Sequence, residues 1–414
     1  MQSTLLLPDV HPSSPARRRL LAGGAASATL ALFGCGGGGG GGGGDVSGVG
    51  STADASFSSG PISGFGSIIV NNLRYDDTAA RILDDAGQAV TTAALRLGMV
   101  VEVNGSGIAV DASGLRRSVA STISLRSEIE GPITAIDTAA RTFAVLGQTV
   151  QWADATLYSD NLPNGAASLA VGQVVQVFGL RNPDGLYSAT LVVRDEPVPT
   201  RYKLRGVVSA LDGTAQTFRI GGAVIAYGAV ASQAPGIANG QYARVELQTA
   251  PDASGRWMAS ALRTTASSVT LPSGNNVAVE LKGYITAFTS NTAFSVNGVP
   301  VNASGVANPP AGLALGRRVD VKGVFVSGQF NASEIALEEA GSLASRSFDV
   351  KGSIQRVIPA ASVIVVRGVP VHYASARFEG GTASDLAENR SVEIQAQVAA
   401  GTFGLVAQTI RFVA

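Results

Sequence analysis

The 414-residue sequence predicts an all-β protein made of tandem, small, five-stranded antiparallel units. Three observations lead to this fold class. The chain contains 51 glycines, and 45% hydrophobic residues make it too apolar for a disordered chain. Short runs alternate apolar and polar residues, which is typical of strands. The same pattern of glycines and apolar residues recurs roughly every 70 residues, which indicates internal repeats.

Each repeat opens with a glycine two residues before an apolar position. The fourth copy begins at Gly283 and continues into Phe294-Ser295-Val296-Asn297-Gly298, where an alternating strand ends in an Asn-Gly pair. Asn-Gly between two alternating runs predicts a β-hairpin, because both residues accept a positive φ. The opening glycines of the five copies are Gly60, Gly131, Gly206, Gly283 and Gly352.

A second turn and two further strands follow in every copy. In the fourth copy the turn ends at Gly316, Val319 and Val321 share one face of the next strand, and Ala332 precedes Ile335 in the last strand. Period-two alternation without a strong helical period predicts about five short strands per unit. The predicted units span residues 57–127, 128–199, 200–268, 277–340 and 346–414.

A five-stranded unit of this size can bury both its core and its edges only by curling on itself. An OB-like barrel is the favoured closure. A small β-sandwich is the alternative, because strand count and turn spacing fit both architectures. Residues 77–97 and 153–170 have a weak helical period that allows one helical turn in each segment.

The first copy also carries a longer motif. Residues 60–75 read GPISGFGSIIVNNLRY. This stretch resembles the start of a bacterial repeat family called domain of unknown function 5666. The resemblance covers most of residues 57–414, although later copies keep the strand columns and lose the Ser-Gly-Phe-Gly-Ser loop. It implies tandem β-domains in a secreted or lipid-anchored protein, and it brings no established activity and no catalytic residues.

The N-terminal segment predicts export and attachment to a membrane. Arg17 and Arg18 precede an apolar run too short to span a bilayer, which is typical of a secretory signal over residues 1–34. The arginine pair also resembles a twin-arginine signal, and either export route fits. Leu32-Phe33-Gly34-Cys35 resembles a bacterial lipobox, in which the cysteine is lipidated. Residues 35–56 would then form a Gly/Ser-rich tether, and the absence of an aspartate after Cys35 favours an outer-membrane lipoprotein facing the periplasm or the cell surface.

The residue types of common catalytic and metal sites are scarce. The formal net charge is zero, so no basic face for nucleic acid is expected. His372 is the only histidine after the signal and Cys35 the only cysteine, which excludes Ser-His-Asp and Cys-His catalysis and His- or Cys-rich zinc sites. Asp84-Asp85 is interpreted as a pair of solvated loop charges, and Trp257 as a packing residue. No catalytic, cofactor-binding or metal-binding residue is therefore predicted.

Together these patterns favour a membrane-anchored, non-enzymatic binding or scaffold lipoprotein that presents repeated β-domains at the bacterial cell envelope. The expected partners are the membrane, through a lipid on Cys35, and a glycan, peptidoglycan or protein ligand. Linked weak sites would reinforce one another. The alternative is a carboxylate-dependent hydrolase acting on an envelope or extracellular glycan, with two carboxylates brought together in one cleft.

Overall fold

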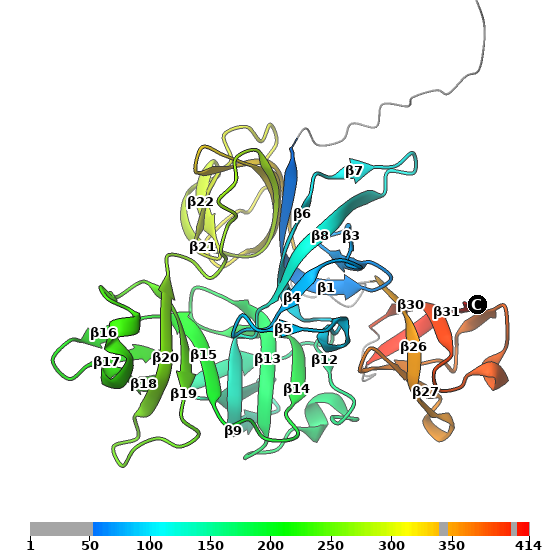
Figure 1. Cartoon of the computed structure of the whole chain (residues 1–414), viewed down its shortest axis with the longest axis horizontal. Helices are drawn as coiled ribbons and strands as arrows, with labels where there is room; N and C mark the ends of the chain where they lie inside the picture. The colour runs from blue at the N-terminus through cyan, green and yellow to red at the C-terminus, as the bar shows by residue number, and fades with distance from the viewer. Residues whose placement is uncertain (1–52, 339–346, 399–403, 414) are drawn as a thin grey trace, which may run out of the picture. The chain divides into compact units, whose positions relative to one another are not determined.

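The computed structural model describes residues 53–338, 347–398 and 404–413, coloured along the chain in Figure 1. The predicted lipid-attachment residue Cys35 and the predicted export residues Arg17 and Arg18 lie outside these ranges. Within them, the backbone is almost entirely strand and turn, and it forms five successive barrels. No helix in this part of the chain is long and apolar enough to cross a membrane.

Each barrel is formed by five main strands. Barrel 1 contains β1 (Ala55–Gly64), β2 (Ile68–Val70), β3 (Leu73–Asp76), β6 (Val100–Ser106) and β8 (Arg116–Leu125). Barrel 2 contains β9 (Ile129–Asp137), β10 (Thr142–Val145), β11 (Gln148–Gln151), β13 (Val174–Arg181) and β14 (Tyr187–Arg194). Barrel 3 contains β15 (Tyr202–Val207), continued by β16 (Ser209–Asp212), then β17 (Thr217–Ile220), β18 (Ala223–Ala226), β19 (Tyr242–Leu247) and β20 (Trp257–Thr265). Barrel 4 contains β21 (Val277–Ser290), β22 (Ala293–Val296), β23 (Val299–Asn302), β24 (Arg318–Val326) and β25 (Gln329–Leu337). Barrel 5 contains β26 (Ser347–Ile358), β27 (Val363–Val366), β28 (Val369–His372), β30 (Ser391–Gln397) and β31 (Leu405–Phe412).

Short elements occupy the connections between these strands. The minor strands are β4 (Arg81–Leu83), β5 (Ala89–Val90), β7 (Ala109–Val110), β12 (Leu157–Tyr158) and β29 (Arg377–Glu379). The 3-10 helices are η1 (Thr92–Ala94), η2 (Gly165–Ser168), η3 (Gly228–Gln233), η5 (Pro359–Ala361) and η6 (Ala383–Asp385). η1 and η2 fall within the segments 77–97 and 153–170, where the sequence predicts a helical turn.

The strand order shows how each unit closes. In barrel 4, β21 pairs antiparallel with β22, and β22 with β23. β23 then pairs parallel with β25, which returns through β24 to β21. The first, second, third, fifth and fourth strands thus form a closed circuit, and the other four barrels repeat it. This is the closure of an OB-like barrel, so the favoured prediction is confirmed and the sandwich alternative is wrong.

The hairpin between the second and third strands has the predicted turn chemistry. In barrel 4, Asn297 and Gly298 have φ values of 52° and 80°, as a type I′ turn requires. Barrel 3 differs, because Gly221 has a φ of 52° whereas Gly222 does not have a positive φ. Gly222 therefore does not adopt the left-handed conformation of its counterpart Gly298. Positive φ at only the first central residue is the pattern of a type II′ turn.

The opening glycine of each repeat makes room for this hairpin. In barrel 4, Asn297 folds back over Gly283, where a Cβ atom would collide with the Asn297 amide. The Asn297 amide donates from Nδ2 to the carbonyl of Lys282 at 3.1 Å, and its Oδ1 accepts from the N–H of Tyr284 at 3.2 Å. Strand and turn are thereby held together, which explains why glycine recurs at this position.

Aromatic residues at the barrel ends pack against the cores. The ring of Trp257 lies edge-on to Tyr202 at 6.0 Å, and that of Trp152 is tilted against Phe143 at 6.1 Å. Both tryptophans pack against the core shared by barrels 2 and 3. The interpretation of Trp257 as a packing residue is confirmed.

Hydrogen-bonded strands join barrels that are distant in sequence as well as neighbours. Residues 55–59 of β1 pair parallel with residues 277–281 of β21, which links barrels 1 and 4. Residues 203–204 of β15 pair with residues 129–130 of β9, which links barrels 2 and 3. Barrel 5 meets barrel 1 where the N–H of Phe65 donates to the carbonyl of Asp349 at 2.7 Å.

Candidate ligand pocket

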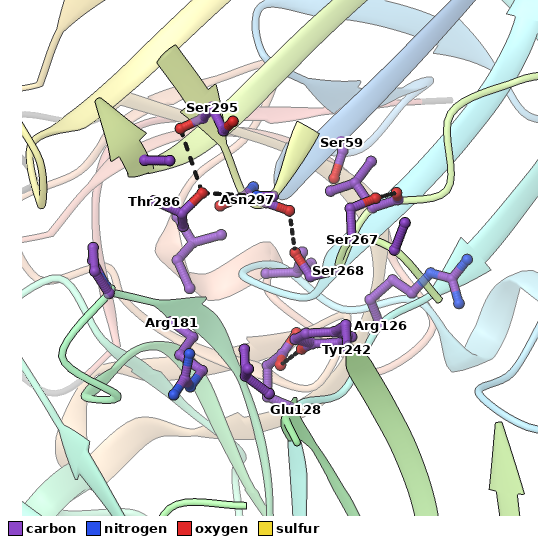
Figure 2. Close-up of a pocket in the computed structure, with 18 of the residues that line it drawn as sticks. Ser59, Arg126, Glu128, Arg181, Tyr242, Ser267, Ser268, Thr286, Ser295 and Asn297 are labelled. Carbon is purple, nitrogen blue, oxygen red and sulfur yellow. Dashed lines mark hydrogen bonds between the residues drawn. The ribbon is translucent and has the colours of Figure 1, made fainter. Parts of the chain in front are cut away.

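A cavity of about 350 Å³ lies among barrels 1 to 4 and the segment that connects barrel 3 to barrel 4 (Figure 2). We call it the inter-barrel pocket. A volume in this range is typical of small-molecule sites, which often form at domain interfaces. The lining residues are Ser59, Val100, Glu102, Arg126, Glu128, Gly179, Leu180, Arg181, Pro183, Val207, Gly240, Tyr242, Ala266, Ser267, Ser268, Val269, Thr286, Ala287, Ser295, Asn297 and Gly298.

Neutral polar groups form one wall of the pocket (Figure 2). The Thr286 hydroxyl accepts from the N–H of Gly298 at 2.9 Å and donates to the carbonyl of Ser295 at 3.4 Å. The Ser268 hydroxyl donates to the carbonyl of Asn297 at 2.9 Å. The segment between barrels 3 and 4 is thus fastened to the hairpin turn of barrel 4. These bonds fix the wall before any ligand arrives.

Glu128 and Tyr242 lie on the opposite side of the pocket (Figure 2). The Tyr242 hydroxyl donates to Oε2 of Glu128 at 2.7 Å. Burial raises the pKa of Glu128, while Arg205 and the hydrogen bond from Tyr242 oppose the rise. Burial, and then Glu128 itself, raise the pKa of Tyr242 well above its usual value. The tyrosine therefore stays protonated and acts as a fixed donor.

A buried ion pair lies near Glu128, and its arginine, Arg205, opposes the rise in the pKa of Glu128 that burial causes. Arg205 and Asp85 are bonded at 2.7 Å, and their side chains are only 5% and 4% exposed. The N–H and the hydroxyl of Ser127 also donate to Asp85. Burial opposes the charge on Arg205, but Asp85 and Glu128 together raise its pKa. The interpretation of Asp85 as a solvated loop charge is wrong, because the loop of barrel 1 docks against barrel 3.

The charges that line the inter-barrel pocket balance. Glu102 is ion-paired with Arg126 and also accepts from the N–H of Thr270 at 3.2 Å. Arg181 ends β13, and its guanidinium lies 5.8 Å from the centre of the Tyr187 ring. In the part of the chain that the structure describes, Arg181 has no ion-pair partner. With Glu128, the lining thus contains two carboxyl groups and two guanidinium groups.

A second hollow of about 420 Å³ lies over β26, β30 and β31 of barrel 5. Its charged side chains all pair with one another. The pairs are Arg74–Asp349 at 2.6 Å, Lys351–Glu393 at 2.7 Å, Arg377–Glu379 at 2.7 Å and Arg411–Glu379 at 2.9 Å. The charged groups of this hollow already bind one another. The inter-barrel pocket is therefore the better candidate for a ligand site. The described residues contain no group of three or more His, Cys, Asp or Glu side chains able to hold a metal ion.

The sequence predicts Ser295, Asn297 and Gly298 as parts of a hairpin, and it predicts no functional role for any pocket residue. A sequence pattern could have drawn attention to Glu102, which lies between Val101 and Val103 in the fourth strand of its barrel. An acidic residue recurs between the two apolar residues of this strand in three other copies, as Glu246, Asp320 and Glu393. By contrast, Arg181 and Tyr242 meet in one pocket only through the docking of barrels 2 and 3, and no local pattern predicts their proximity.

Three of the barrels match a known family model. The family described as domain of unknown function (DUF5666) matches residues 130–193, 282–336 and 351–411, which fall in barrels 2, 4 and 5. The chain carries tandem repeats that resemble this domain. The DUF5666 segments do not include residues 60–75, where the sequence resemblance is most complete, although barrels 1 and 3 share the strand order of the matched repeats.

Neither curated proteins nor solved structures give a second family or a function for the chain. No curated protein matches the chain. Among solved structures, the chain is similar to drosophila Unr CSD456 at 13% identity, over 51% of this chain and 96% of that chain, with a TM-score of 0.14. At this TM-score the similarity has no bearing on function.

Proposed function

We propose that the protein is a membrane-anchored, non-enzymatic binding or scaffold lipoprotein of the bacterial cell envelope. The observation that carries this proposal is the inter-barrel pocket, whose neutral polar wall and whose Glu128 side chain are fixed by hydrogen bonds. A pre-formed pocket of this size suits a small polar ligand, such as part of a glycan or of peptidoglycan, or a protein side chain. The tandem DUF5666 repeats supply the rigid frame.

The anchor is part of the proposal. Arg17 and Arg18 would direct export, and Cys35 would carry the lipid that holds the protein at the outer membrane, facing the periplasm or the cell surface. We expect Cys35→Ser to move the protein almost entirely from the membrane fraction to the aqueous phase, because the barrels would lose their lipid. Detergent-phase partitioning of both forms measures this. Gly40→Ser, in the same segment, should stay with the membrane, and a Cys35→Ser protein that still partitions with detergent would contradict the anchor.

The pocket is tested by filling it. Ala287 is an exposed residue of β21 at the pocket wall, so Ala287→Trp adds bulk without disturbing a core. We expect this variant to weaken ligand binding by at least about tenfold. A binding screen with saccharides, peptidoglycan fragments and peptides on the whole protein provides the ligands. Ser333→Trp, at an exposed position of β25 in the same barrel, should bind normally. Equal binding by the wild type and both variants would overturn the proposed function.

One observation favours the hydrolase alternative. Glu102 and Glu128 line the same pocket, and burial raises the pKa of Glu128, as a general acid requires. Against this, Arg126 pairs with Glu102 and Tyr242 holds one oxygen of Glu128. Chromatography of saccharides incubated with the protein separates the two functions. Cleavage that is lost in Glu128→Gln would establish the enzyme, whereas recovery of intact saccharide supports binding alone.

A further inference from the structure

This inference rests on the proposed function and concerns the class of ligand. Glu128 is held rigidly by its neighbours. Its N–H donates to the carbonyl of Val177 at 2.8 Å, and its carbonyl accepts from the N–H of Arg205 at 2.9 Å. Its Oε2 accepts from the Tyr242 hydroxyl at 2.7 Å. Among the described residues, no donor reaches the remaining oxygen, Oε1.

An unpaired oxygen on this side chain defines what the pocket can recognise. Glu128 is 8% exposed and lines the pocket, so its Oε1 can be reached from the pocket. Oε1 is not among the buried side-chain atoms that lack a partner, so it faces the pocket, where a ligand donor can replace water at this acceptor. The ligand group is therefore a hydrogen-bond donor, such as a hydroxyl, an amide N–H or an ammonium.

The charged residues that line the pocket determine which ligand charge fits it. A ligand cation would approach the guanidinium groups of Arg126 and Arg181, and a ligand anion would approach the carboxyl groups of Glu102 and Glu128. The two positive and two negative groups of the lining balance, which favours a neutral ligand. The hydroxyls of Ser59 and Ser295, for which no side-chain partner exists in the described residues, offer further donors and acceptors for neutral hydroxyl groups.

We propose that the inter-barrel pocket binds a neutral saccharide, one hydroxyl of which donates to Oε1 of Glu128. Tyr242 is a positioning residue, because it fixes the carboxyl group through the other oxygen. Saccharides are the ligand class that combines several neutral hydroxyl donors in a volume suited to this pocket. A polar site of this kind rejects an analogue that lacks the bonded hydroxyl, since its acceptor is then left unpaired.

The test compares matched sugars on the whole protein by titration calorimetry. The first set is cellobiose, cellobiouronic acid and the disaccharide of glucosamine, which are neutral, anionic and cationic. The second is methyl β-glucoside with its monodeoxy analogues. We expect cellobiose to bind most tightly, and one monodeoxy analogue to bind about 10- to 100-fold more weakly than its parent. In Glu128→Gln the parent should weaken by a similar factor, and the penalty for that deoxy analogue should disappear.

The control is Glu246→Gln, a half-buried acidic residue on the same strand as Tyr242 but outside the pocket. It should bind cellobiose as the wild type does. Preference for the charged disaccharides, or unchanged binding by Glu128→Gln, would overturn the inference. If the ligand displaced by Ala287→Trp is a peptide, the inference fails and the proposed function stands. If no ligand is affected by Ala287→Trp, both fail.

Discussion

Asp85→Ala is expected to lower the free energy of unfolding of the barrel 2 and 3 region by about 3–5 kcal/mol, because it leaves Arg205 charged and buried without a partner. The pair is bonded at 2.7 Å with both side chains almost fully buried. The change also removes the acceptor of the Ser127 N–H. Urea denaturation followed by the fluorescence of Trp152 and Trp257 reports on this region, since both indoles pack against its core.

Two control variants test whether the loss of stability comes from the burial of the ion pair and not from the loss of a charge alone. Asp154 is paired with Arg141 at 2.9 Å, but their side chains are 44% and 55% exposed, so Asp154→Ala should cost less than about 1 kcal/mol. Replacing both partners, as Asp85→Ala with Arg205→Met, should restore part of the stability, because Arg205 is then no longer buried without Asp85. Equal shifts for Asp85→Ala and Asp154→Ala would refute the docking of barrel 1 against barrel 3.

Glu280 is expected to make stability depend on pH. It lies in β21 where barrels 1 and 4 are joined, is 1% exposed and is ion-paired with Arg116. Burial raises its pKa from 4.5 to about 7, with Arg116 and Lys322 opposing the rise and Asp320 adding to it. The folded state therefore holds this proton more tightly than the unfolded state. The stabilisation is fully present below pH 4.5 and is lost as the pH rises through about 7.

The measurement is the difference in unfolding free energy between the wild type and Glu280→Gln, which cannot ionise. Taking the difference cancels most other titrating groups. Between pH 4 and pH 8 we expect the wild type to lose about 3 kcal/mol of unfolding free energy relative to Glu280→Gln. Glu334→Gln, an exposed residue paired with Lys322 at 2.9 Å in the same barrel, should show no such trend. A constant difference for Glu280→Gln would contradict the raised pKa.

The barrel fold could be predicted from the sequence because its signals are local. Asn297 and Gly298 specify a turn through their own backbone preferences, and the strands beside them alternate with period two. The sequence favours closure into a barrel over a sandwich but does not determine it. Closure depends on the parallel pairing of β23 with β25, between residues that lie far apart in the chain.

The pocket could not be predicted in the same way. Glu102 and Glu393 occupy equivalent positions in barrels 1 and 5, yet their side chains are 5% and 38% exposed. The difference arises from what docks against each strand, and not from the strand itself. A carboxylate on the outer face of a strand is therefore solvated in one repeat and buried in another. Asp85 is buried for the same reason, although the sequence alone predicts a solvated loop charge.

The pairing of residues 55–59 with residues 277–281 also has a consequence for the order of folding. During synthesis, barrel 1 emerges first, but its outer strand edge has no partner until β21 has been made, after barrels 2 and 3. Contacts of such long sequence separation form slowly, and an unpaired edge can recruit a strand from another chain. Barrel 1 can close its own circuit of strands, but the edge of residues 55–59 stays open while barrels 2 and 3 are made. That edge is covered only when the fourth barrel forms.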